Sequence, residues 1–234
     1  MRERLVILGA GGHGAELQAY VRDLARRGWP GEFLGFLDDA LAPGRNRNLE
    51  ILGPLDTFLN RAPEFFENLL YLTALGSNSI RKRVVERFEA LYGDRVAPWT
   101  LIHPLAWTGE EVVIGAGACL APGATVTSRV RIGRHAILNV KASVSHDCVV
   151  GDYVNINPGA TVCGKVMIGD GAYIGAGATL IDTVSVGRNT IVGAGAVVIN
   201  DIPDDVTAVG VPARIVKRHG QLRRCAGLAE LSGE

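Results

Sequence analysis

The stretch Val149–Ile174, VVGDYVNINPGATVCGKVMIGDGAYI, carries an aliphatic residue at every sixth position. The same frame extends in both directions without an insertion, from about Ile102 to Pro203. An α-helix would show apolar spacings of three and four, and a simple strand would alternate strictly, so neither explains this period. The aliphatic positions of the frame are Ile114, Leu120, Val126, Ile132, Leu138, Val144, Val150, Ile156, Val162, Ile168, Ile174, Leu180, Val186, Val192 and Val198.

A sustained six-residue repeat predicts a hexapeptide parallel β-helix, in which each repeat forms one short strand and a turn. Three repeats complete one triangular coil, so residues eighteen apart stack at the strand spacing of roughly 4.8 Å. Prisms of this kind wind left-handed, against the usual right-handed crossover of parallel strands. Small residues four positions after each aliphatic residue, such as Ala118, Ala142 and Ala178, are expected to let the chain turn each corner.

The first 98 residues follow a different pattern, in which apolar runs alternate with amphipathic stretches. The run Leu5–Leu8 leads into the glycine-rich turn Gly9–Gly14, and a helical pattern follows it. Further strands are expected at Phe33–Leu37 and Leu69–Leu75, and a basic helix from about 80 to 91. This alternation predicts a small Rossmann-like parallel α/β domain, whose ligands bind beyond the carboxyl ends of the strands.

We therefore expect three parts: a nucleotide-sugar-binding domain over 1–98, a β-helix over 99–216 and a C-terminal tail over 217–234. The 24 basic and 24 acidic residues balance, so no electrostatic argument favours nucleic acid or an anionic membrane as a partner. The four cysteines form no close pair, which argues against zinc and against a disulfide framework. Without a leader pattern or a long apolar run, the protein is expected to be soluble and cytoplasmic, with no membrane insertion.

The N-terminal turn also matches the dinucleotide fingerprint G-x-G-x-x-G through Gly9, Gly11 and Gly14, with Asp38 downstream. An NAD-linked enzyme is therefore one alternative, but the domain is short for a complete dinucleotide fold. A bound nucleotide or nucleotide sugar and a purely structural turn are the other two interpretations.

Six motifs occur along the chain in this order: Gly9–Gly14, Phe36–Asp39, Leu75–Arg81, Ile102–Pro104, Ser145–Asp147 and Val209–Arg214. Together they resemble bacterial hexapeptide acetyltransferases, namely sialic acid O-acetyltransferases of the NeuD type and nucleotide-sugar N-acetyltransferases. The resemblance covers Leu5 to about Lys217 and implies acetyl-CoA as donor, a nucleotide-sugar acceptor, no metal, and a homotrimer with active sites at subunit interfaces.

Acetyl transfer needs a base for the attacking group and a donor for the developing oxyanion. His146 lies at a corner position of the repeat with Asp147 beside it, and Gly164 lies eighteen residues later, one coil away. The resemblance implies that His146 is the general base, that Asp147 tunes it and that the Gly164 N–H binds the carbonyl oxygen. It also implies that Asn139 helps to hold the catalytic pair.

Simpler roles are open for the same residues. Asp147 stacks on Arg129 and Lys165 and could be the centre of an ion ladder. Asn139 stacks on Asn157 and could belong to a structural asparagine ladder, and His146 could be a solvated corner residue. His135 lacks an acidic neighbour and is expected at the surface, while His103 is expected to shape the start of the prism and His219 to lie in a basic tail.

The resemblance also implies residues that bind the two substrates. For the donor the small residues are equally explained by the repeat itself, which requires them. The acetyl-CoA candidates are Asn155, Gly164, Gly175, Ala176, Gly193 and Ala194, and the acceptor candidates are Gly11, Gly12, His13, Gly14, Asp38, Asp39, Gly76 and Ser79.

The resulting hypothesis is an acetyl-CoA-dependent N-acetyltransferase of a nucleotide-linked amino sugar in surface-glycan biosynthesis, in which the amine attacks the thioester directly. Cys163 near the base keeps an acyl-enzyme as a minor alternative. O-acetylation of sialic acid or a related sugar is the alternative within the class. A non-catalytic scaffold that binds nucleotide sugars is the alternative from another class.

Overall fold

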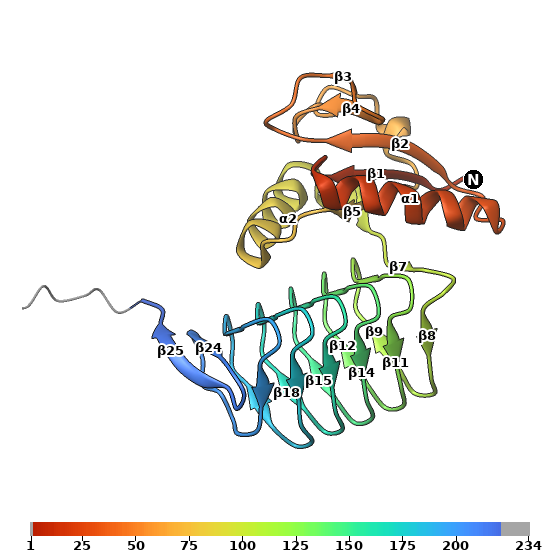
Figure 1. The fold of residues 1–234 in the computed structure, drawn as a ribbon. Coiled ribbons are helices and arrows are strands. Elements are labelled where there is room, and N and C mark those ends of the chain that lie inside the picture. The colour runs from red at the N-terminus through yellow and green to blue at the C-terminus, as the bar shows by residue number, and fades with distance from the viewer. Residues whose placement is uncertain (1, 221–234) are drawn as a thin grey trace, which may run out of the picture.

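The computed structural model describes residues 2–220 and shows an N-terminal α/β domain above a prism of short stacked strands (Figure 1). The N-terminal domain holds a six-stranded sheet in the order β3-β4-β2-β1-β5-β6, which is parallel except for the β3–β4 pair. Its elements are β1 (Arg4–Leu8), α1 (Gly12–Arg26), β2 (Glu32–Leu37), β3 (Gly44–Asn46), β4 (Leu49–Gly53), η1 (Pro63–Phe66), β5 (Leu69–Thr73), α2 (Asn78–Tyr92), η2 (Gly93–Arg95) and β6 (Ala97–Pro98).

The two helices cover opposite faces of this sheet because β1 is apolar on both sides. Leu5 and Ile7 pack on the α1 side, and Val6 and Leu8 pack on the α2 side. All four side chains are fully buried. A strand buried on both faces reads as a continuous apolar run, as the sequence indicated.

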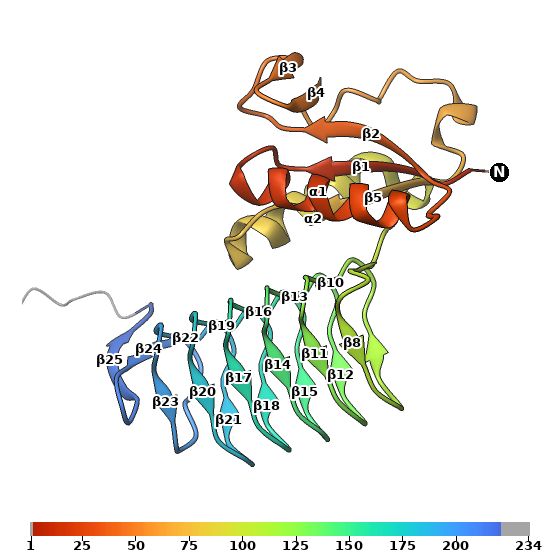
Figure 2. The same ribbon diagram turned by 45° about the vertical axis from the view of Figure 1, so that its right-hand side comes forward.

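The prism has three faces of stacked parallel strands, numbered here in chain order. Figure 2 shows these strands stacked in register along the length of the prism. The first face ends in the β24–β25 hairpin, with β24 (Val206–Val209) and β25 (Arg214–Arg218). The first face holds β7 (Leu101–Ile102), β10 (Cys119–Leu120), β13 (Ile137–Leu138), β16 (Asn155–Ile156), β19 (Tyr173–Ile174) and β22 (Ile191–Val192). The second face holds β8 (Trp107–Thr108), β11 (Thr125–Val126), β14 (Ser143–Val144), β17 (Thr161–Val162), β20 (Thr179–Leu180) and β23 (Val197–Val198). The third face holds β9 (Val113–Ile114), β12 (Arg131–Ile132), β15 (Val149–Val150), β18 (Met167–Ile168) and β21 (Ser185–Val186).

The left-handed β-helix and the Rossmann-like domain are therefore both confirmed. Both apolar positions of the hexad point inward, as Val144 and Cys148 illustrate with 0 % exposure. The four-residue turns between residues 109 and 196 each also contain one residue with a left-handed backbone, and Asp147 takes this conformation with a φ of 60°. Aspartate, asparagine and glycine tolerate that region better than most residues.

Two segments differ from expectation. No strand was predicted between Leu37 and Leu69, but β3 and β4 extend the sheet edge there, because Leu49 and Ile51 of β4 are buried against it. At the other end, β25 runs through Arg218, into the segment expected as tail, and His219 packs back with its Nε2 2.9 Å from Thr207 Oγ1. The remainder of the expected tail, residues 221–234, lies outside the described residues.

His135 is not at the surface, and that expectation was wrong. The N-terminal domain covers the first face and the adjacent corner, so the ring is fully buried between Tyr71, with centroids 5.9 Å apart, and Tyr153, with centroids 5.2 Å apart. Arg81 of α2 is also fully buried beside it and donates to the backbone oxygens of His135, Tyr153 and Leu75. Sequence spacing alone could not show which face another domain covers.

His103 is also buried, at 2 % exposure, at the start of the prism. Its Nδ1 accepts from the N–H of Leu105, so it shapes the first turn as expected. The ring also packs edge-on against Tyr20 of α1 and lies 3.4 Å from Asp23. It therefore joins the start of the prism to α1.

Candidate active site

His146 lies on the corner between the second and third faces, in the turn from β14 to β15, and half of its side chain is exposed. Its Nδ1 lies 2.7 Å from Asp147 Oδ2. A carboxylate at Nδ1 favours the tautomer that carries the proton there, because the carboxylate can only accept. Nε2 then carries the lone pair that a general base needs.

Asp147 makes a second strong contact that bears on its alternative role. Arg129, one coil earlier, donates to both carboxylate oxygens, with Nε–Oδ1 at 2.7 Å and Nη2–Oδ2 at 3.2 Å. The Arg129 hydrogen bond, followed by that of His146, holds the pKa of the Asp147 carboxyl well below its usual range. Asp147 is therefore a permanent anion that orients the imidazole, and its ladder with Arg129 supports this role.

Gly164 lies one coil beyond His146, and the two meet as the eighteen-residue spacing predicted. A Cβ built on Gly164 would lie 2.7 Å from His146 Cε1 and 2.9 Å from Nε2, so no side chain fits there. However, the Gly164 N–H donates to Asp182 Oδ1 at 2.9 Å. The expected oxyanion donor is thus already paired, and the sequence reasoning missed Asp182, although it lies eighteen residues after Gly164.

Cys163, the alternative nucleophile, lies next to Gly164 on the same corner. Burial, reinforced by the charge of Asp182, raises the pKa of its thiol. A thiol nucleophile acts as the thiolate, so this environment disfavours acyl transfer through Cys163.

Asn139 and Asn155 do not reach His146 within one chain. Asn139 lies on the corner between the first and second faces, a different edge of the prism. Asn155 is 2 % exposed on the first face and donates from Nδ2 to Gly76 O at 2.6 Å, so the chain's own N-terminal domain covers it. Asn157, on which Asn139 was expected to stack, donates from Nδ2 to the backbone oxygen of Ile174 in the next coil at 2.7 Å.

Four of the small residues proposed for the donor follow the corner between the first and second faces, whereas Gly164 lies on the corner that carries His146. Ala176 and Ala194 are exposed on the first of these corners. A Cβ on Gly175 would lie 2.5 Å from Ala194 N, and one on Gly193 would lie 2.7 Å from Val209 Cγ1. The stacking of coils therefore requires both glycines, whatever binds beside them.

The glycine turn after β1 leads directly into α1, which begins at Gly12 with Gly11 as its N-cap residue. A Cβ on Gly11 or Gly12 would meet open space, so a ligand has access to the helix N-terminus. His13 Nδ1 lies 2.9 Å from Glu16 Oε2, and its buried Nε2 has no hydrogen-bond partner among the described residues. This arrangement suits a phosphate, because free N–H groups and the helix dipole favour an anion.

The remaining acceptor candidates divide into structural and accessible residues. Gly14 packs against the backbone of Gly9, where a Cβ would lie 2.7 Å from the carbonyl oxygen. Asp38 accepts from Ala10 N and so holds the glycine turn, which differs from the ribose contact of a dinucleotide fold. Asp39 is paired with Arg87 of α2.

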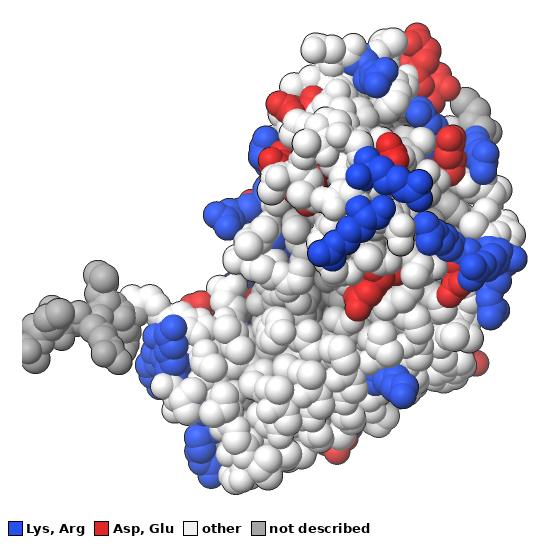
Figure 3. All heavy atoms as spheres, turned by 45° about the horizontal axis from the view of Figure 1, so that its top comes forward, with Lys and Arg blue, Asp and Glu red and all other residues white. Residues whose placement is uncertain are grey.

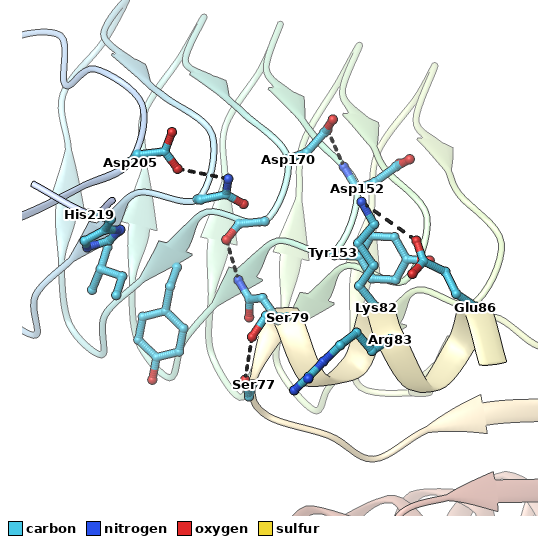
Figure 4. Close-up of a pocket in the computed structure, with 15 residues that line it drawn as sticks. Ser77, Ser79, Lys82, Arg83, Glu86, Asp152, Tyr153, Asp170, Asp205 and His219 are labelled. Carbon is cyan, nitrogen blue, oxygen red and sulfur yellow. Dashed lines mark hydrogen bonds and ion pairs between the residues drawn. The ribbon is translucent and has the colours of Figure 1, made fainter. Parts of the chain in front are cut away.

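A cleft of about 990 Å³ lies between the start of α2 and the later coils of the prism (Figure 4). Ser79 lines it, together with Lys82 and Arg83, which sequence reasoning missed. On the prism side the exposed Tyr173 and Ile191 of the first face contribute apolar surface. Asn78 Nδ2 fixes this edge by donating to Gly171 O at 2.8 Å and Ala172 O at 2.9 Å.

Figure 3 shows charged side chains of both signs gathered on the N-terminal domain, whereas the visible surface of the prism is mostly uncharged. Within residues 2–220, no group of three His, Cys, Asp or Glu side chains is arranged to hold a metal ion. Over the same part of the chain, none of the helices has the length and hydropathy needed to cross a bilayer.

Two family models match the sequence: the PglD N-terminal domain over residues 4–88 and the bacterial transferase hexapeptide (six repeats) over residues 165–200. UDP-N-acetylbacillosamine N-acetyltransferase of Bacillus subtilis (strain 168) is 36% identical over 118 residues, which cover 50% of this chain and 51% of that protein. The chain spans about half the length of the curated relatives it matches.

Solved structures match nearly the whole fold. The acetyltransferase domain of PglB from Neisseria gonorrhoeae FA1090, in complex with acetyl coenzyme A, is 33% identical with a TM-score of 0.82 and covers 92% of this chain and 100% of that chain. PerB from Caulobacter crescentus, in complex with CoA and GDP-perosamine, is 30% identical with a TM-score of 0.78 and covers 90% and 96%.

Proposed function

The chain belongs to the hexapeptide-repeat sugar acetyltransferases that carry a PglD-type N-terminal domain, and from this membership we propose that it acetylates the amine of a nucleotide-linked amino sugar with acetyl-CoA. One observation carries the proposal. The imidazole of His146, held at Nδ1 by Asp147, presents its free nitrogen beside Gly164, where the chain carries no side chain that would block a thioester. The relatives whose names specify a substrate act on UDP-N-acetylbacillosamine and GDP-perosamine, and both are nucleotide-linked amino sugars.

The reaction balances with these groups. The acceptor, once its ammonium group has lost a proton to solvent, attacks the thioester carbonyl carbon as a neutral amine, and His146 Nε2 takes a proton from the nitrogen as the C–N bond forms. The Gly164 amide stabilises the negative charge on the carbonyl oxygen. The C–S bond then breaks, and His146 returns its proton to the sulfur, which leaves the amide and CoA thiol as products.

We place each active site between two chains of a homotrimer. The N-terminal domain carries the acceptor candidates, such as Gly11–Gly14, at the carboxyl-end edge of its sheet, here called the acceptor edge. This domain covers the first face, where Leu101 and Cys119 are buried. His146 lies on the opposite corner, between the second and third faces. One chain therefore cannot bring its own acceptor edge to its own base. A neighbouring chain supplies the missing half: its N-terminal domain brings the acceptor edge to the base, and its Asn139 and small corner residues line the pantetheine arm.

The test is thiol release from acetyl-CoA with GDP-perosamine and UDP-linked amino sugars, for the wild type and His146→Ala. We expect turnover with one of these amines and a loss of about a hundredfold or more in the variant, since general base catalysis contributes 10²–10⁴-fold. Acetylation of a hydroxyl sugar instead would support O-acetyl transfer, and sugar-nucleotide binding without turnover would support a scaffold. Near-wild-type turnover by His146→Ala would refute the base assignment.

Mixed oligomers test the interface. His146→Ala and His13→Ala chains, each inactive or weak alone, are refolded or co-expressed together. If the site is shared, some interfaces of the mixture combine an intact base with an intact acceptor edge, so activity returns. No recovery in verified mixed trimers would place both halves within one chain.

A further inference from the structure

Asp182 lies one coil beyond Gly164 on the corner that carries His146, in the turn between β20 and β21. A Cβ built on Gly164 would be 2.9 Å from His146 Nε2 and 3.0 Å from Asp182 Oδ1. The imidazole nitrogen and the carboxylate oxygen thus both lie on the side of Gly164 toward which its Cβ would point. The mechanism above uses the imidazole and the glycine but gives no role to this carboxylate.

His146 Nε2 and Asp182 Oδ1 are both hydrogen-bond acceptors. His146 Nδ1 is engaged with Asp147, so Nε2 accepts, and an ionised carboxylate such as that of Asp182 also only accepts. A primary amine matches this arrangement, because it has two N–H donors and a lone pair. One N–H can point to His146, the other to Asp182, and the lone pair to the thioester carbon. A sugar hydroxyl has a single donor and leaves one acceptor without a partner.

We propose that Asp182 is a specificity-determining residue that selects a primary amine over a hydroxyl as the acetyl acceptor. This inference rests on the proposed function. In the free protein Asp182 Oδ1 accepts the Gly164 N–H at 2.9 Å. When the amine binds, the carboxylate takes its second N–H instead and releases the Gly164 amide to the thioester carbonyl oxygen.

The exchange fits the charge changes of the reaction. As the C–N bond forms, the nitrogen becomes positive and the carbonyl oxygen becomes negative. Asp182 beside the nitrogen stabilises the first charge, and the Gly164 amide stabilises the second. His146 then removes the proton from nitrogen and passes it to the CoA sulfur as the C–S bond breaks. With a hydroxyl acceptor, Asp182 would stay on the amide and repel the developing oxyanion.

The bond between Asp182 and a backbone amide is not unusual in this prism. Asp170 Oδ1 accepts from Asp152 N at 2.9 Å, and Asp204 Oδ1 accepts from Arg188 N at 2.7 Å, each also toward an earlier coil. Such contacts stabilise the stacking of turns. Asp182 differs from these residues because the imidazole of His146 lies beside it, on the same side of Gly164. Asp204 therefore provides a matched structural control.

The experiment compares the wild type with Asp182→Ala, Asp182→Asn and Asp204→Ala. The first acceptor pair is GDP-perosamine and GDP-rhamnose, which carries a hydroxyl in place of the amine; if a UDP-linked amine is the substrate, its hydroxyl counterpart is used. kcat/KM is measured for the amine sugar, and the inhibition constant for the hydroxyl sugar as a competitor. Thermal melting and light scattering monitor folding and assembly.

We expect Asp182→Ala to lower kcat/KM for the amine by about ten- to a hundredfold, the usual effect of one hydrogen bond to a charged group. The inhibition constant of the hydroxyl sugar should not change, and Asp204→Ala should change neither quantity. Asp182→Asn keeps an acceptor oxygen but no charge, so its kcat/KM should lie between those of Asp182→Ala and the wild type.

Other outcomes overturn the inference. Unchanged or higher amine turnover in Asp182→Ala would make Asp182 a spectator or an obstruction, and an equal loss in Asp204→Ala would reduce it to a stacking contact. An equal weakening of the hydroxyl sugar would indicate general positioning without selection. If the wild type acetylates no amine, the proposed function itself fails, whereas amine turnover that is insensitive to Asp182 removes only this inference.

Discussion

Replacement of His135 by phenylalanine should remove a defined part of the acid sensitivity of the fold. The ring is fully buried between Tyr71 and Tyr153, and neither ring nitrogen has a hydrogen-bond partner among the described residues. Burial, aided by the charge of Arg134, lowers the pKa of His135 to about 4 from a usual value of 6.5. Phenylalanine keeps the stacking, loses no hydrogen bond and cannot be protonated.

The sign follows from proton binding. Between pH 6.5 and 4 the unfolded chain binds a proton at His135 and the folded chain does not, so protonation favours unfolding. The stability that the neutral imidazole of His135 allows is therefore fully present above about pH 6.5, and the free energy of unfolding falls as the pH is lowered toward 4. The full shift corresponds to about 3 kcal/mol, of which about 2 kcal/mol should be lost between pH 8 and pH 5.

The assay is urea unfolding followed by circular dichroism at pH 8 and pH 5, at one fixed protein concentration because the stability of the proposed oligomer would depend on it. Other groups titrate in the same window, so the measured quantity is the difference between the wild type and His135→Phe. We expect the two to agree within about 1 kcal/mol at pH 8 and the variant to be more stable by about 2 kcal/mol at pH 5. Identical pH dependence in both proteins would refute the buried, neutral state of this histidine.

Three further predictions concern other residues. Arg81→Met should cost about 3–5 kcal/mol in urea unfolding, because one buried and two partly buried backbone carbonyls lose their donor; a cost below about 1 kcal/mol would contradict this. Gly117→Ala should lower the melting temperature well beyond Gly195→Ala, since both have left-handed backbones but only at Gly117 would a Cβ overlap the buried imidazole; equal shifts would exclude the overlap. Asp147→Asn should lower kcat about a hundredfold, because the imidazole of His146 would no longer be held in the tautomer with its proton on Nδ1. The melting temperature should change little, because the ion pairs of Asp147 are exposed. An unchanged kcat would indicate that Asp147 serves only in the ion ladder.

The sequence predicted what depends on local repetition. The hexad frame gave the prism, its inward positions and the meeting of His146 with Gly164, because residues eighteen apart must stack in a three-sided coil. The same arithmetic leads to Asp182, eighteen residues beyond Gly164, and could have found it before the structure. Site residues within one corner of a solenoid are therefore accessible to sequence reasoning.

Contacts between the two domains were not accessible in this way. His135 occupies the same kind of turn position as other corner residues, yet it is buried because α2 and β5 lie over it. Asn155 is likewise covered because Gly76 lies above the first face. Which face a second domain covers depends on matching surfaces distant in the chain, and the six-residue repeat makes all three faces look alike.

The choice of face also determines how catalysis must be organised. A triangular prism has one corner opposite each face, and the N-terminal domain covers the face opposite the corner that carries His146. Had the domain packed on the second or third face, its acceptor edge would have bordered that corner, and a single chain could have held a whole site. Because it packs on the first face, the base and the acceptor edge of one chain point away from each other. Under the proposed function, assembly is then a requirement of the chemistry, and variants that separate the proposed trimer without unfolding the prism should be inactive even with every proposed catalytic residue intact.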